Sequence, residues 1–224
     1  MKAAGPGRPG RVGAGRRTPR RVRGAGPLAR LLLGLAGLCG SAAQSQVPPG
    51  VPPDAGVEVR IVNGCALWPY AQCPGADLRH ARLSGLDLRG VNFRGAQLAR
   101  ADLRFANLAG ATLDGADLTG AKAYALNAPG ASFKGARLVA ADLEMARLFR
   151  ANFSHADLTA ASLEAAKLNL VWFVEARLVN ANLQEGKFVA SNLKGADLSG
   201  SVTRFAIFPD TLREGCTGCP AGWD

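Results

Sequence analysis

Between Ala76 and Gly200 the sequence consists of 25 consecutive five-residue repeats, with no insertion or deletion in the frame. The third position is Leu or Phe in 23 of the 25 repeats, the exceptions being Ala123 and Ala128. The first position is Ala in 19 repeats, and the second is Asp or Asn in 13. A repeat this regular restricts the architecture more than any other feature of the chain. It predicts the shape of the protein but not what the protein binds.

A five-residue period fits neither a helix nor a straight strand. In a helix, a step of five residues rotates each Leu by about 140°, so no apolar stripe forms. In a strand, an odd period sends alternate Leu residues to opposite faces. The first and third positions can all point inward if the chain bends once in every repeat. Such a chain closes into a stacked solenoid with coils about 4.8 Å apart.

The pattern A-(D/N)-L-x-x resembles the pentapeptide-repeat family, over slightly more than half of the chain. The resemblance implies an all-β fold, the right-handed quadrilateral β-helix, with four repeats per coil and the first and third positions inward. The repeats would make about six coils and a rod about 30 Å long. Residues twenty apart would stack in inner ladders, one of Leu78, Leu98, Leu118, Leu138, Leu158, Leu178 and Leu198, and another of Phe93, Leu113, Phe133, Phe153, Phe173 and Leu193. The exchanged sizes of Leu126 and Ala128, followed by Pro129, predict a kink or bulge within residues 121–130.

The first 43 residues have the features of a signal peptide with a long Arg-rich n-region. A short apolar run, Leu31 to Cys39, precedes small residues that suit cleavage before Gln44. This run is far shorter than the roughly 18 residues of a membrane span, so we expect no stable membrane anchor. The predicted location is therefore outside the cytoplasm, secreted or periplasmic. An organelle lumen reached through a transit peptide is the alternative.

The remaining segments complete the predicted organisation. Residues 44–56 form a Pro-rich linker, residues 57–75 an N-terminal cap, residues 76–200 the repeat domain, and residues 201–224 a C-terminal cap and Cys-containing tail. A bare solenoid end exposes core side chains and an unpaired edge, so the caps are expected to cover the ends. The predicted covering residues are Trp68 and Tyr70 at one end, and Phe205, Ile207, Phe208 and Leu212 at the other. Residues 54–224 carry 18 basic and 17 acidic residues, which argues against nucleic-acid binding.

Four cysteines remain once Cys39 leaves with the signal. In an exported chain an even number of cysteines predicts disulfides. The implied rod separates the two pairs, and bridged Cα atoms must lie within about 7 Å. The pairing expected within one molecule is then Cys65 with Cys73 and Cys216 with Cys219. Two alternatives stay open: a zinc site, which needs all four thiolates together, and a redox-active C-x-x-C, which normally lies at a helix start.

The chain shows no phosphate-binding loop, G-x-S-x-G motif or clustered metal ligands. His80 and His155 occupy outward positions about four coils apart. The recurring Asp residues are expected to accept hydrogen bonds from the local backbone at turns. The sequence therefore predicts no enzyme activity, no cofactor and no metal. Asn152-Phe153-Ser154 matches a glycosylation acceptor.

Six outward positions are apolar where polar residues are expected: Phe149, Leu170, Trp172, Val174, Val179 and Val189. We call these six residues the apolar patch. Contiguous apolar surface often marks a partner site. We therefore expect a non-catalytic, exported repeat scaffold or protein-binding module whose patch contacts an unknown protein partner or a second copy. Cover by the linker or the tail is the alternative.

Two other functions are possible from the sequence. Some pentapeptide-repeat proteins protect DNA gyrase by presenting an acidic, duplex-like surface, so the resemblance also allows an intracellular DNA mimic that inhibits or protects a topoisomerase. The export leader, the near-neutral charge and outward arginines such as Arg79, Arg89, Arg94 and Arg104 depart from that pattern. A redox-active thiol protein using Cys216 and Cys219 is the third function.

Overall fold

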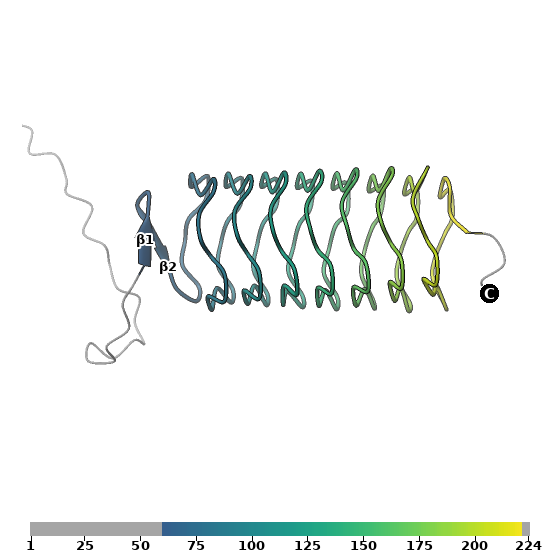
Figure 1. Ribbon diagram of the computed structural model, residues 1–224, viewed down its shortest axis with the longest axis horizontal. Coiled ribbons are helices and arrows are strands. Elements are labelled where there is room, and N and C mark those ends of the chain that lie inside the picture. Colours follow the sequence, from purple (N-terminus) through teal and green to yellow (C-terminus); the bar gives the residue numbers. More distant parts are fainter. Residues whose placement is uncertain (1–59, 221–224) are drawn as a thin grey trace, which may run out of the picture. The chain divides into compact units, whose positions relative to one another are not determined.

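The structure is a computed structural model that describes residues 60–220. The predicted signal peptide and linker lie outside the described residues, as do residues 57–59 and 221–224. The described part begins with two short strands, β1 (Arg60–Val62) and β2 (Cys65–Leu67), and continues as a regular coil (Figure 1). The strands form an antiparallel hairpin in which Ile61 faces Ala66. Asn63 and Gly64 make its turn with positive φ, as an Asn-Gly hairpin turn requires.

Parallel bridges between residues twenty apart hold the coil together, from Gln72↔Asn92 to Asp197↔Thr217. This spacing confirms four repeats per coil. In each repeat the third residue donates a backbone hydrogen bond to the following coil, as Leu103 does to Lys122 at 2.7 Å. From Asn92 to Thr217 the second residue donates to the preceding coil, so each inner coil is bonded on both sides.

Four walls run along the coil, each built from every fourth repeat. They are numbered from repeats 76–80 (wall 1), 81–85 (wall 2), 86–90 (wall 3) and 91–95 (wall 4). The fifth residue of every repeat from Gly75 to Gly215 has positive φ, which turns the chain at each corner. Second-position side chains therefore lie on the walls, and fifth-position side chains lie at the corners.

The core consists of the first and third positions, as predicted, and both inner ladders are buried. The Phe133 and Phe153 rings stack with centroids 4.6 Å apart, and Phe153 and Phe173 stack at 5.2 Å. The predicted kink or bulge at 121–130 is wrong, because Leu126 and Ala128 are both fully buried and the bridges continue through them. The exchange keeps the total side-chain volume, which cores tolerate.

Both ends of the coil differ from the prediction. The ladder starts at Gln72, so repeat 71–75 belongs to the coil and not to the cap, and Cys73 fills its inward third position. The ladder also continues past Gly200 to Thr217. Of the predicted covering residues, Trp68 packs against the core and Phe208 is buried. The other four are exposed, with Tyr70 at 67%, Phe205 at 64%, Ile207 at 40% and Leu212 at 62%, so their predicted role is wrong.

Candidate protein-binding surface

The apolar patch is centred on the corner between walls 3 and 4. Phe149 and Trp172 are its most exposed members, at 44% and 55%. Leu170, Val174 and Val189 are half-buried on the same two walls, whereas Val179 lies on wall 1 and is not part of this cluster. A hollow of about 370 Å³ is lined by Arg150, Leu170 and Trp172. The Arg150 guanidinium lies 5.2 Å from the centre of the Phe149 ring.

One buried polar atom lies beside this patch. Asn169 follows Phe149 and precedes Val189 at the same position of wall 3. Its Oδ1 atom is buried, and no hydrogen-bond partner lies near it among the described residues. A buried acceptor without a donor costs about 1–3 kcal/mol. This part of the surface is therefore not the most stable arrangement that the repeat allows.

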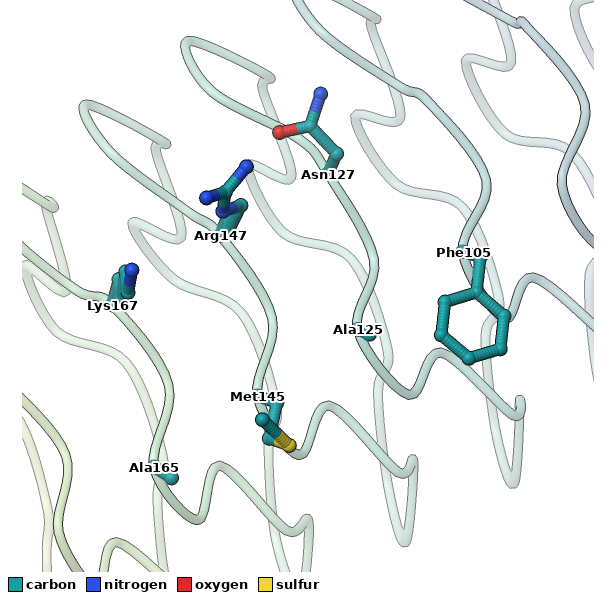
Figure 2. Close-up of a pocket in the computed structure, with 7 residues that line it drawn as sticks. All are labelled: Phe105, Ala125, Asn127, Met145, Arg147, Ala165 and Lys167. Carbon is teal, nitrogen blue, oxygen red and sulfur yellow. The ribbon is translucent and has the colours of Figure 1, made fainter.

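A second hollow lies at the corner between walls 2 and 3, and the sequence reasoning missed it. This corner groove has a volume of about 400 Å³ and is lined by Phe105, Ala125, Asn127, Met145, Arg147, Ala165 and Lys167. Figure 2 shows two parallel rows, with Phe105, Ala125, Met145 and Ala165 along one side and Asn127, Arg147 and Lys167 along the other. Phe105 and Met145 are 61% and 49% exposed. Their shared fifth position, two coils apart, was the signal available in the sequence.

An aromatic contact fixes the apolar row of the corner groove. Tyr124 packs edge-on against Phe105 with ring centroids 5.6 Å apart. The Tyr124 hydroxyl donates to Met145 Sδ at 3.0 Å. These contacts join three successive coils, so the row is held by side chains as well as by the backbone ladder.

Three cations follow one another along wall 3. Arg147 bridges Lys167, and Lys167 bridges Lys187, all at the second position. We call these three residues the basic column. The column lies between the corner groove, which Arg147 and Lys167 line, and the corner of walls 3 and 4, which Phe149 and Leu170 of the same repeats border. The signal available in the sequence was the spacing of these three basic residues, which are twenty residues apart at the same position of the repeat.

The recurring Asp residues have the predicted local role. The backbone N–H two residues later donates to Asp77, Asp117 and Asp142 at 3.2, 2.9 and 3.1 Å. The Arg79 side chain also bonds Asp77, and these contacts lower the pKa of that carboxyl to about 2. At Asp157 burial raises the pKa, but the bonds from Thr159 and the charges of neighbouring arginines outweigh burial and lower it. These carboxylates stabilise turns.

The structure pairs the cysteines locally. Cys65 is bonded to Cys73, with Cα atoms 5.4 Å apart, and Cys216 to Cys219, with Cα atoms 5.8 Å apart. The first bond ties the hairpin to the first coil. Within residues 60–220 no three His, Cys, Asp or Glu side chains group as a metal site. Cys216 follows a turn and does not start a helix.

His80 and His155 lie exposed at two different corners, at the ends of repeats 76–80 and 151–155, as their outward positions predict. His155 Nδ1 is 3.2 Å from Glu175. The glycosylation motif does not fit the folded chain, because Asn152 is only 8% exposed and accepts a hydrogen bond from Ser154 N at 2.9 Å. Within the described part of the chain, no helix has the length and hydropathy needed to cross a bilayer.

Comparison with known families agrees with this geometry. The family profile described as Pentapeptide repeats (8 copies) matches residues 66–95, 96–135, 125–154 and 161–202, which together exceed half of the chain. This chain belongs to the pentapeptide-repeat family. Its coil is the all-β, right-handed quadrilateral β-helix of that family. Pentapeptide-repeat proteins are generally non-catalytic structural or binding proteins.

Several solved pentapeptide-repeat proteins are similar to this chain. HetL of the cyanobacterium Nostoc, involved in regulating heterocyst differentiation, is 24% identical over 65% of this chain and 86% of its own, with a TM-score of 0.39. A protein of the Arabidopsis thaliana thylakoid lumen is 31% identical over 55% and 71%, with a TM-score of 0.38. QnrB1, a plasmid-mediated fluoroquinolone resistance protein, is 18% identical over 65% and 87%, with a TM-score of 0.39. No functionally curated protein matches the sequence.

Proposed function

We propose that this protein is a non-catalytic, exported binding rod that recognises a partner protein through wall 3 and its two apolar corners. The observation that carries the proposal is the pair of hollows flanking that wall, each bordered by exposed apolar side chains. Met145 lies on one corner, and Phe149 and Trp172 lie on the other. Large apolar side chains around a concave surface are typical anchors of protein interfaces.

The local chemistry supports binding rather than catalysis. The two histidines lie at different corners about four coils apart, and the Asp side chains are engaged at turns. The unpaired Oδ1 of Asn169 lies next to Phe149 in the repeat ladder, so the surface there departs from the arrangement best for stability alone. Stability given up at a surface is characteristic of sites with a function.

Export is supported by the leader and by the cysteines. The Arg-rich start, short apolar run and small residues before Gln44 form a signal-like sequence. The four remaining cysteines lie in two local pairs, an arrangement that persists in oxidising compartments. Intact-mass spectrometry of the protein from its native host, with and without reduction and thiol labelling, tests this part. A mass beginning near Gln44 with four masked thiols is expected, and a full-length mass with free thiols would remove export.

The binding site is tested by position-specific photocrosslinking in the native host. A photoreactive residue replaces Trp172 in one variant and Thr112 in the control, because both occupy the second position of wall 4, three coils apart. We expect one discrete crosslinked protein from position 172 and none from position 112. Adding Phe149→Ser should abolish the product. Equal crosslinking from both positions, or none from either, would refute the site, whereas a product containing two copies of this chain would identify a homodimer.

A DNA-mimic protector of a topoisomerase has less support, because such a surface requires stacked acidic charge. At the bridged second positions of residues 60–220 the like-charged neighbours are basic, and the acidic neighbours Glu144 and Glu164 at the fourth position of wall 2 make a stack of only two. A redox role for Cys216 and Cys219 lacks the helix start that lowers a thiol pKa.

A further inference from the structure

Charged second-position neighbours along the ladder of residues 60–220 have opposite signs everywhere except in the basic column. Second-position side chains of successive coils stand next to each other, and in most charged pairs the signs are opposite. These pairs are Arg82↔Asp102, Asp102↔Lys122, Lys122↔Asp142, Asp117↔Arg137, Arg137↔Asp157, Asp157↔Arg177 and Arg177↔Asp197. Among the bridges of the described residues, only Arg147↔Lys167 and Lys167↔Lys187 join like charges. Both belong to the basic column on wall 3.

Alternating charges stabilise their own wall, whereas the basic column does not. On wall 1 the neighbouring Arg137 and Arg177 help to lower the pKa of Asp157, so the ladder itself neutralises that carboxylate. Like charges facing each other across neighbouring strands repel. The ion pairs within residues 60–220 include none of the three cations of the column.

The fold does not require cations at this position. The second position of wall 4 carries neutral residues along its length, including Thr112, Ser132 and Asn152, and its bridges form equally well. Three stacked cations that form no ion pair within residues 60–220, in a ladder that elsewhere alternates in sign or is neutral, are therefore explained best by a negative charge supplied from outside. Charge complementarity of this kind sets the specificity of protein interfaces.

The surroundings of the column decide what kind of anion fits. On one side lies the apolar row of the corner groove, with Phe105 and Met145 exposed, and on the other lie Phe149 and Trp172. Glu144 and Glu164 occupy the fourth position of wall 2, beyond the apolar row, and Glu164 accepts a hydrogen bond from Asn182. Carboxylates beyond the apolar row disfavour a uniform polyanion such as nucleic acid. An occupant with one acidic and one apolar edge matches the two rows of the groove.

We propose that the basic column, together with the corner groove, binds an extended acidic segment of the partner protein. Its carboxylates lie against Arg147, Lys167 and Lys187, and its apolar side chains lie against the row of Phe105 and Met145. In an extended segment successive side chains point to opposite edges, so alternating acidic and apolar residues present both edges at once. This inference rests on the proposed binding function and names the chemistry of its partner.

The test uses a labelled peptide of alternating Glu and Leu, with Gln–Leu, Lys–Leu and Glu–Ser peptides of the same length as comparisons. Fluorescence anisotropy measures binding to the full chain, at low and at physiological salt. We expect the Glu–Leu peptide to bind most tightly and to weaken as salt rises, because salt screens exposed charges. The Lys–Leu peptide should not bind.

Two charge reversals form a matched pair. Lys167→Glu turns the column into an alternating ladder like those of walls 1 and 2, so the melting temperature should stay the same or rise while peptide affinity falls by about tenfold or more. Arg177→Glu is the same charge change on wall 1, where it leaves three carboxylates in succession, at positions 157, 177 and 197. It should lower the melting temperature and leave peptide affinity unchanged. Unchanged affinity in folded Lys167→Glu would overturn the proposal.

Three other results would assign a different occupant to the basic column and would overturn the proposal of an acidic partner segment. A single-stranded oligonucleotide or a vesicle rich in phosphatidylserine that binds more tightly than Glu–Leu, with Glu–Ser as good as Glu–Leu, would assign the column to a polyanion. A dimer that Lys167→Glu dissociates would assign it to a second copy. If Met145→Ala or Trp172→Ala abolishes binding while Lys167→Glu does not, the binding surface stands and its acidic specificity fails. If the folded wild type binds no peptide and gives no crosslink from position 172, the proposed binding function and the acidic specificity of the column both fail.

Discussion

Replacing Phe153 with Ala would test the interior of the coil directly. The side chain is fully buried, and its ring stacks between Phe133 at 4.6 Å and Phe173 at 5.2 Å. Truncating a buried Phe to Ala costs about 3–5 kcal/mol, and more where the surroundings cannot close the cavity. Backbone hydrogen bonds fix the coils on both sides, so little collapse is available. We expect a loss of about 4–5 kcal/mol in the free energy of unfolding.

Two further variants separate volume from ring stacking. Phe153→Leu keeps most of the volume, and Leu113 and Leu193 already occupy the same inner ladder without exposure. It loses two ring contacts, each worth about 0.5–1.5 kcal/mol, so we expect a cost of about 1–2 kcal/mol. Phe105→Ala makes the same deletion as Phe153→Ala at a ring that is 61% exposed, and should cost less than about 1 kcal/mol.

The assay is equilibrium urea unfolding followed by far-ultraviolet circular dichroism. The comparison requires equal slopes of free energy against urea in all variants, because partial unfolding of terminal coils would change the slope. If Phe153→Ala lowers the free energy of unfolding no more than Phe105→Ala does, the buried Phe153 ring does not stabilise the coil as argued. A Leu variant as unstable as the Ala variant would show that ring stacking, and not volume, holds this core.

Two more predictions concern acid and reduction. Asp77, Asp102 and Asp197 have pKa values lowered by hydrogen bonds from Arg79, Arg104 and Ser199 respectively. A carboxyl with a lower pKa in the folded than in the unfolded chain stabilises the fold above its unfolded pKa, near about 4, and the contribution is lost as the pH falls towards the folded value. The melting temperature should therefore fall between about pH 4 and pH 2, and Asp77→Asn should make that fall shallower; a parallel profile would contradict this origin. For the disulfides, Cys65→Ala/Cys73→Ala should lower the free energy of unfolding by about 2–3 kcal/mol, and Cys216→Ala/Cys219→Ala by about 1–2 kcal/mol, because the first bond closes the longer loop. Urea unfolding measures both, and a larger effect at the C-terminal pair would contradict the loop argument.

The regular part of the fold could be predicted because its information is local. Each repeat contains its own inward residues and its own turn residue. As long as the five-residue frame is uninterrupted, the third position points inward in every repeat, at Leu178 as at Leu78. The structure confirms that both are buried and that residues twenty apart bridge. The Asp turns were predictable for the same reason, since donor and acceptor are two residues apart.

The ends were predicted less well because the repeat signal is weak there. Cys73 was assigned to the cap, since Cys replaces the expected Leu, yet it fills an inward position of the coil. Tyr70 and Leu212 were expected to cover core side chains but are exposed. Whether an apolar residue covers an end depends on the path of the flanking chain, which no repeat specifies.

The sequence by itself determined the five-residue frame and the inward first and third positions, which follow from short-range backbone geometry repeated without interruption. The four repeats per coil, and the rod that separates the two cysteine pairs, were implied by the resemblance to the family. Only the tertiary structure decided the surface: that Phe105 and Met145 border a groove, that Asn152 is nearly buried, and that the cations of the basic column stack on one another without an ion pair among the described residues. These properties arise between residues on different coils, where distance and exposure depend on how the coils stack.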